Sequence, residues 1–212
     1  MTKKNAPEHS HVVREIHHRV KNNLQIIASI MRLQLRQEDS PAAQSALSGA
    51  IQRLMGMMQV HDLLARVDVT SVDLKELLGR LLELNIQTFL LPGQVIRHEV
   101  RGAGLSVPPD PALSVALAVN ELIINAIKHG FAGRKEGRVD IELSQTEGEI
   151  EVRVVDNGIG LEEGFSLTGS AHLGLRLVQS VIRDDLKGQF EVSSKEGVSV
   201  LIRFPSKPSG PS

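Results

Sequence analysis

Residues 120–129 read Asn-Glu-Leu-Ile-Ile-Asn-Ala-Ile-Lys-His, an apolar helical stretch that carries several polar side chains. At about 100° per residue, four of these fall on or near one face of the helix: Glu121, Asn125, Lys128 and His129. Asn125 is unusual, because amides are poor residues for a helix interior. Its amide oxygen suits a hard cation such as Mg²⁺, which keeps phosphates as further ligands, and Lys128 could meet those phosphates. On these residues alone, a polar helix face without a ligand is an equal alternative.

A second stretch, Asp156-Asn157-Gly158-Ile159-Gly160, directly follows an apolar strand. A carboxylate at the end of a buried strand needs a partner, and Asp156 could accept a hydrogen bond from an exocyclic amine such as adenine N6. Gly158 and Gly160 would let the backbone approach a flat ring closely. The alternative is an ordinary Asp-Asn-Gly turn. The second glycine and the long segment after it favour the ligand site.

A third stretch begins where residues 161–173, with little periodicity, give way to a helix predicted over 174–186. A glycine ahead of a helix N-terminus can bind phosphate, because free backbone N–H groups and the helix dipole face the anion. A single glycine-rich loop indicates this only weakly. Neither a Walker A loop nor a dinucleotide-binding fingerprint occurs in the chain.

Near the start of the chain, residues 15–23 read Glu-Ile-His-His-Arg-Val-Lys-Asn-Asn within a helix predicted over 11–37. Helical spacing places His18 nearly opposite the apolar side, with Glu15 one turn before it, and His17 toward the apolar edge. The two histidines are therefore not equivalent. A lone histidine on a polar helix face is usually an ordinary surface residue, so its interpretation depends on the rest of the chain.

The chain is predicted to fold in two parts. Pro41 separates the first helix from a second over 42–66, since proline disfavours helix in the residue before it. The predicted divisions are a disordered lead-in over 1–10, a helical hairpin over 11–66, a linker over 67–72, an α/β domain over 73–205 and a flexible tail over 206–212.

The second part mixes helices with strands. Two hairpins are predicted, pairing 138–144 with 149–155 and 188–194 with 198–204. These patterns indicate an α+β protein: a helical hairpin followed by an α/β sandwich. We expect its sheet to be mixed, mainly antiparallel, and covered by helices on one face.

Composition narrows the range of functions. The 212 residues are 41% hydrophobic and carry a net charge of −1, so the chain should fold without a general attraction to nucleic acid or anionic membrane. Cysteine is absent, which excludes disulfides and cysteine metal sites. Without a signal segment or a run of eighteen apolar residues, we expect a soluble cytoplasmic protein that spans no membrane.

In this order and spacing, residues 120–129, 156–160 and 174–178 resemble the N, G1 and G2 boxes of the GHKL (Bergerat) ATP-binding fold. The preceding hairpin, with residues 15–25, resembles the phosphoacceptor hairpin of sensor histidine kinases. The subgroup that it resembles carries His-Arg-x-Lys-Asn and is related to the HWE kinases. The resemblance covers about residues 11–205, and four boxes in order are far more specific than any one.

The resemblance implies a role for each matching residue. His18 would be the phosphoacceptor, because Asn22 lies four residues on, where the acceptor helix of the family has Asn or Thr. Asn125 would bind Mg²⁺, and Glu121 would line the same site as a catalytic residue that could orient water or the metal. The other nucleotide contacts would come from Lys128 and His129 at the phosphates, Asp156 at adenine, Gly158 and Gly160 around it, and Leu173, Gly174 and Leu175 beside the phosphates and the pocket wall. Residues 161–173 would form a lid over ATP.

Three positions depart from the family pattern. Arg19 follows the acceptor where most histidine kinases have an acidic base, and Glu15, one turn earlier, is the substitute candidate. HWE kinases have a histidine before the N-box glutamate and a later Trp-x-Glu, whereas this chain has Asn120 and no tryptophan. Many members have a threonine after the glycine of the last hairpin, near the adenine carboxylate. Here Ser199 takes that role or the hydrogen bond is lost.

The resemblance implies a two-component histidine kinase that phosphorylates its own His18 with ATP and passes the phosphoryl group to an aspartate of a response regulator receiver domain. It also implies a homodimer through the hairpin, and a separate sensor protein could supply the signal. Two alternatives remain, the first on the same scaffold and the second sharing only the ATP-binding fold. One is a phosphotransfer relay or response-regulator phosphatase with a degenerate ATP domain, against which the intact boxes argue. The other is an anti-sigma-factor-type serine kinase, which would not need His18.

Overall fold

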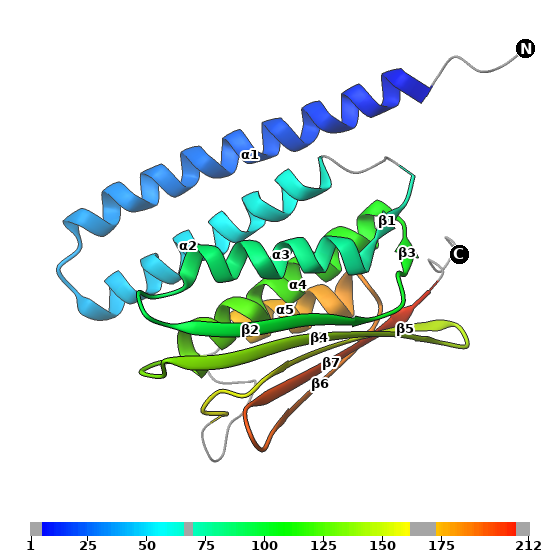
Figure 1. The fold of residues 1–212 in the computed structure, drawn as a ribbon. Helices are drawn as coiled ribbons and strands as arrows, with labels where there is room; N and C mark the ends of the chain where they lie inside the picture. Colours follow the sequence, from blue (N-terminus) through cyan, green and yellow to red (C-terminus); the bar gives the residue numbers. More distant parts are fainter. Residues whose placement is uncertain (1–5, 66–69, 162–172, 207–212) are drawn as a thin grey trace, which may run out of the picture. The chain divides into compact units, whose positions relative to one another are not determined.

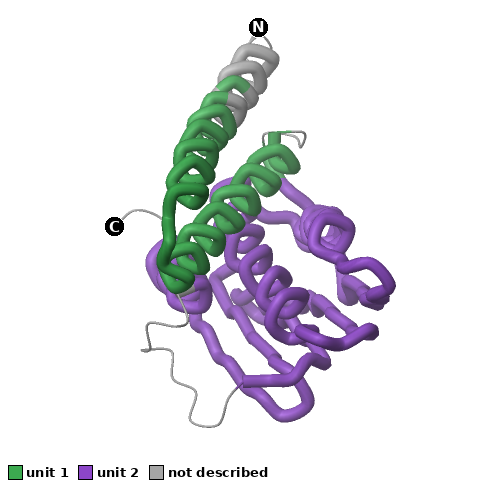
Figure 2. The backbone as a smooth tube through the Cα atoms, turned by 90° about the vertical axis from the view of Figure 1, so that its left-hand side faces the viewer, with its two compact units in different colours: residues 1–71 green, residues 72–212 purple. Residues whose placement is uncertain are grey.

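The computed structural model describes residues 6–65, 70–161 and 173–206, with the side chains of all of these except 6–14, 16–18 and 173. The chain divides into two compact units, residues 1–71 and residues 72–212 (Figures 1 and 2). The division lies within the predicted linker. The first five residues of the predicted lead-in and nearly all of the predicted tail lie outside the described residues.

The first unit is a hairpin of two helices, α1 (Ala6–Gln37) and α2 (Pro41–Leu64) (Figure 1). Ser40 ends the connection as the N-cap of α2, where its hydroxyl accepts a hydrogen bond from the Ala43 N–H at 3.4 Å. Pro41 occupies the first turn, where its missing N–H costs nothing. The Lys21 ammonium joins the helices by an ion pair to Asp62, 2.5 Å away. Helix α1 begins five residues before the predicted start.

The second unit is built around a five-stranded sheet in the order β2-β4-β5-β7-β6. Among the described strands of this sheet, β2 and β4 pair in parallel and the other neighbours pair antiparallel, so the sheet is mixed and mainly antiparallel, as predicted. A separate antiparallel pair, β1 with β3, was not predicted. The elements in chain order are β1 (Val72–Asp73), α3 (Leu74–Phe89), β2 (Val95–Gly102), β3 (Ser106–Val107), α4 (Pro109–Asn125), the π-helix η1 (Ala126–Gly130), β4 (Glu136–Thr146), β5 (Glu149–Asp156), α5 (Leu173–Asp184), β6 (Gln189–Ser194) and β7 (Val198–Pro205).

Helices α3, α4 and α5 cover one face of this sheet (Figure 1). The strand pattern explains why: in β4, Val139, Ile141 and Leu143 are buried, while the residues between them are more exposed. Among the described residues, the apolar part of the core is aliphatic apart from the buried rings of Phe131 and Phe204. The fold class predicted from the sequence is confirmed.

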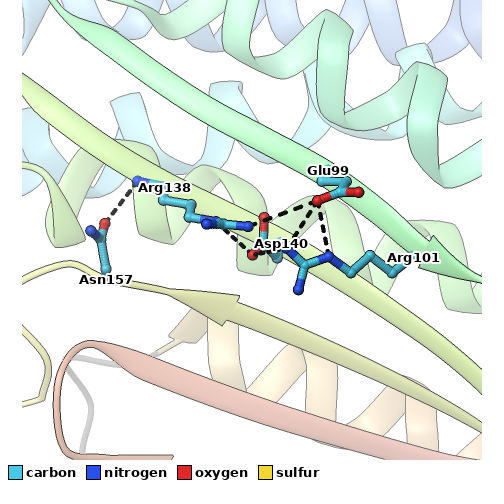
Figure 3. Close-up of polar contacts among 5 residues, drawn as sticks. All are labelled: Glu99, Arg101, Arg138, Asp140 and Asn157. Carbon is cyan, nitrogen blue, oxygen red and sulfur yellow. Dashed lines mark hydrogen bonds and ion pairs between the residues drawn. The ribbon is translucent and has the colours of Figure 1, made fainter.

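The other face of the sheet carries charges that pair with one another (Figure 3). On β2, Arg101 lies 2.9 Å from the carboxylate of Glu99, and on β4, Arg138 lies 2.7 Å from Asp140. The hydrogen bond and charge of Arg101 lower the pKa of Glu99. These ion pairs make this face of the sheet polar.

Among the described residues, one stretch, Pro109–Gly130, is long and apolar enough to cross a membrane by length and composition alone. Within the fold, 67% of the most apolar segment of this stretch is buried. The stretch comprises α4 and η1, and its apolarity is that of a core helix packed between a sheet and its neighbours.

Candidate functional site

Helix α4 carries polar side chains into the core of the second unit. Glu121 is only 5% exposed, and its neighbour Asn120 is 2% exposed. Asn120 is held from α3: the Nδ2 of Asn85 donates to its Oδ1 at 3.0 Å and to the Leu81 carbonyl at 2.8 Å. Buried polar groups need such partners. This amide pair therefore fixes α3 against α4 directly beside Glu121.

The first and third motifs meet at Gly174, in the first turn of α5. A methyl group at Gly174 would lie 3.0 Å from Glu121 Oε2 and 3.7 Å from Asn125 Oδ1. The backbone of α5 therefore passes directly beside both oxygen-bearing side chains of α4. A helix N-terminus with its free N–H groups next to two oxygen donors is an arrangement that suits a phosphate and its counter-ion.

The first motif ends in a π-helix, η1, which is rare and frequently found at functional sites. Its Lys128 lies half-buried with Nζ 4.6 Å from the centre of the Phe89 ring. Burial lowers the pKa of Lys128, and the nearby charge of Glu121 opposes that shift. His129 is exposed. The motif thus continues beyond α4 with a cation close to the Glu121 carboxylate.

The second motif begins with Asp156, the last residue of β5, which is 8% exposed. Its Oδ1 accepts hydrogen bonds from the N–H groups of Gly158 at 2.7 Å and Val198 at 3.3 Å. Burial raises the pKa of Asp156, and the two backbone hydrogen bonds oppose that shift. A buried carboxylate held in this way is a fixed acceptor that can face a hydrogen-bond donor of a ligand.

Gly158 brings the second motif against the end of the first. A methyl group at Gly158 would lie 2.6 Å from the Cα of Gly130, so only glycine fits there. The N–H of Ile159 donates to the Gly130 carbonyl at 2.9 Å, which ties the two backbones together. The backbone at Gly158 was expected to approach a flat ring of a ligand. In the structure it lies against the backbone of Gly130.

Asn157, which the sequence analysis gave no role, anchors the same loop to β4. Its Oδ1 accepts from the Arg138 N–H at 2.7 Å (Figure 3), and its own N–H donates back to the Arg138 carbonyl at 3.2 Å. Arg134 donates to the Asn157 carbonyl. The sequence Asp-Asn-Gly predicts a turn. The contact of Asn157 with Arg138, nineteen residues earlier, cannot be predicted from neighbouring residues.

Ser199 was predicted either to replace the family threonine beside Asp156 or to leave that hydrogen bond unmade. It pairs with Val155 across β5 and β7, so its side chain lies on the open face of the sheet, opposite to that of Asp156. The N–H of Val198, not a hydroxyl of Ser199, reaches the Asp156 carboxylate. Leu175 is buried at 8% exposure, whereas the side chain of Leu173 lies outside the described residues, as do residues 162–172 of the predicted lid.

The oxygen donors of α4 fit a magnesium ion. Glu121 and Asn125 offer a carboxylate and an amide oxygen on one side of Gly174. Mg²⁺ is usually bound through one or two protein groups together with substrate phosphates. Within the described ranges, no group of three or more His, Cys, Asp or Glu residues could hold a metal by itself. The chemistry of the site therefore suits an ion that arrives with phosphate.

In the hairpin, His17 and His18 lie in the backbone of α1, and their side chains are not among those described. Glu15 is described: its Oε1 accepts from both Nε and Nη2 of Arg19, at 3.0 and 2.6 Å. The predicted substitute base is therefore paired with the arginine that follows His18.

The fold and the site define a class: a helical hairpin followed by a GHKL-type α/β domain whose three boxes gather on the helical side of the sheet. Comparisons with known proteins agree. Residues 15–89 match the family described as "Histidine kinase", and residues 111–208 match "Histidine kinase-, DNA gyrase B-, and HSP90-like ATPase".

Individual relatives point to the same family. The chain is 33% identical over 196 residues to the sensor histidine kinase PdtaS of Mycobacterium tuberculosis, covering 91% of this chain and 39% of PdtaS. It is 30% identical over 182 residues to blue-light-activated histidine kinase 2 of Erythrobacter litoralis, covering 84% and 52% of the two chains. The chain thus spans 39% and 52% of the lengths of these relatives.

Solved structures share the architecture. The histidine kinase domain of the Erythrobacter litoralis EL346 blue-light-activated histidine kinase superposes with a TM-score of 0.62 at 25% identity, over 94% of each chain. The chain thus contains a histidine kinase domain and a histidine kinase-like ATPase domain and is homologous to sensor histidine kinases, which confirms the resemblance predicted from the sequence.

Proposed function

We propose that this chain uses ATP to phosphorylate its own His18 and then passes the phosphoryl group to an aspartate of a response regulator. The observation that carries this proposal is the meeting of all three ATP-site boxes in one unit, with Gly174 against Glu121 and Asn125 and with Gly158 against Gly130. An ATP site of this kind, in the same chain as a phosphoacceptor hairpin, would give His18 a phosphate donor.

The proposed step is an in-line displacement. A neutral imidazole nitrogen of His18 forms a bond to the γ-phosphorus, the bond from that phosphorus to the bridging oxygen breaks, and ADP leaves. An ordinary imidazole is largely neutral near pH 7, so one ring nitrogen has a free lone pair for this attack. The other ring nitrogen then loses its proton, for which Glu15 is the acceptor that we propose.

Positioning and electrostatics carry most of the catalysis in phosphoryl transfer. Asn125 and Glu121 would hold Mg²⁺, which supplies positive charge to the phosphates when bound. Lys128 and His129 would contact the phosphates, and the N-terminal backbone of α5 at Gly174 would add N–H donors. Asp156 would accept a hydrogen bond from the adenine amine, beside Gly158 and Gly160.

The proposed partners follow from the family and the hairpin. Histidine kinases generally act on response regulators and dimerise, and α1 exposes a stripe of large apolar side chains: Ile26, Ile27, Ile30 and Leu33, each between 45% and 60% exposed. Exposed apolar patches of this kind mark interaction sites. We propose that α1 contributes to a homodimer, that a separate protein supplies the signal, and that the protein works in the cytoplasm. Light scattering measures the oligomeric state.

The direct test of this function is incubation of the purified chain with γ-labelled ATP and Mg²⁺. Label on the protein that is labile in acid and stable in alkali identifies phosphohistidine, and its loss to an added receiver domain identifies the second step. Acid-stable label on a partner protein would instead indicate a serine kinase. ATP that neither binds nor labels the chain would indicate the relay or phosphatase.

A further inference from the structure

The hydroxyl of Ser194 links two segments that are more than thirty residues apart. Ser194 ends β6, and its Oγ accepts a hydrogen bond from the Leu161 N–H at 2.9 Å. The same Oγ donates to the Gly197 carbonyl at 3.0 Å. One side chain therefore connects the end of the second motif to the turn between β6 and β7.

The hydroxyl also lies against the motif itself. A methyl group at Gly160 would come within 2.7 Å of the Ser194 Oγ. Gly160 has a φ of +78°, a left-handed conformation that side chains disfavour. Ser194 thus contacts the loop at the two residues, Gly160 and Leu161, where it leaves the predicted adenine pocket.

The β6–β7 turn reaches the other end of the same loop. Gly197 packs so closely that any side chain there would collide with the backbone oxygen of Asp156. The next N–H, that of Val198, donates to Asp156 Oδ1. The turn that Ser194 holds through Gly197 is therefore the turn that holds the buried carboxylate.

We propose that Ser194 is a positioning residue for the nucleotide base: by joining Leu161 to the β6–β7 turn, it keeps Asp156 aimed at the exocyclic amine of adenine. This inference rests on the proposed ATP site. Guanine presents a carbonyl oxygen where adenine presents its amine, so a carboxylate held in place favours adenine, and a carboxylate free to turn discriminates less.

The test measures dissociation constants for ATP and GTP by calorimetry on the full chain, with Ser194→Ala and Ser194→Thr. Loss of a hydroxyl that serves two backbone groups should weaken ATP binding by about 5- to 20-fold, with a smaller change for GTP, so the preference for ATP falls. Threonine keeps the hydroxyl and suits a strand, so it should restore the preference. Ser193→Ala is the matched control, since Ser193 pairs with Ser199 on the open face.

The measured ATP preference of the variants tests the role of Ser194. An ATP preference unchanged in Ser194→Ala, or lowered equally in Ser193→Ala, would overturn it. The temperature of thermal unfolding without nucleotide should fall only slightly in Ser194→Ala, because Ser194 is exposed and water can replace its two hydrogen bonds. A large drop with an unchanged ATP preference would make the role structural. If the wild type binds no ATP, the proposed function fails instead, and that result is separate from any effect of Ser194.

Discussion

The guanidinium of Arg19 donates two hydrogen bonds to the carboxylate of Glu15, one helical turn earlier. Its Nε and Nη2 lie 3.0 and 2.6 Å from the same oxygen, Oε1. The two side chains are 76% and 62% exposed, so the pair adds little to stability. Arg19 stands where most histidine kinases have the acidic base. The residue at the usual position of the base is thus paired with Glu15, the carboxylate that we propose as the base instead.

Glu15→Gln should lower the autophosphorylation rate by about 100-fold, in the range for loss of a general base, without changing ATP affinity. Arg19→Gln is the matched control, because it removes the same ion pair but keeps the carboxylate. It should retain most of the rate. Rates are measured by rapid quench with labelled ATP. Equal losses in both variants would show that the ion pair matters and that Glu15 is not the base.

Asp156→Asn should separate nucleotide binding from stability. Burial raises the pKa of Asp156, so the group stabilises the fold below its unfolded pKa, and this contribution is lost as pH rises through its folded pKa. The variant should therefore unfold at a higher temperature than wild type at pH 7, with the difference shrinking in acid. Its ATP affinity should fall by about 10- to 100-fold. Tighter ATP binding, or a lower unfolding temperature at pH 7, would contradict this assignment.

Asn125→Ala should remove the magnesium dependence of nucleotide binding. The variant loses the amide oxygen beside Gly174 but leaves Asp156 untouched, so ATP measured with EDTA should bind as to wild type. Added Mg²⁺ should then strengthen binding in wild type only, and autophosphorylation should fall by at least about 100-fold, as when a transition-state electrostatic contact is lost. Calorimetric titrations with and without Mg²⁺ test this. An unchanged magnesium effect would place the ion elsewhere.

The sequence predicted the parts of the fold that local patterns determine. Alternation in the strands and helical periodicity around Asn125 are repeated over many residues, so the sheet class and the boxes are recoverable from them. The two-residue β1 and β3 pair was missed because Val72–Asp73 and Ser106–Val107 are too short to alternate. The π-helix η1 depends on backbone bonds and carries no residue pattern.

The site was harder to predict from the sequence where contacts between distant residues position its side chains. Asn157 and Ser194 gain their partners, Arg138 and Leu161, only after the sheet has formed. Ser199 was assigned a role beside Asp156 by resemblance to the family. It follows Val198 directly on β7, so its side chain points to the opposite face of the sheet. Alternation shows which residues share a face, but pairing with β5 shows which face carries Asp156.

The most direct test of the central claim compares His18→Gln with His17→Gln after incubation with γ-labelled ATP and Mg²⁺. The two variants differ by one position in α1 and share the intact ATP site, so nucleotide binding should be equal in both. The account predicts acid-labile, alkali-stable label on His17→Gln and none on His18→Gln. Label that survives in His18→Gln at the wild-type level would contradict it.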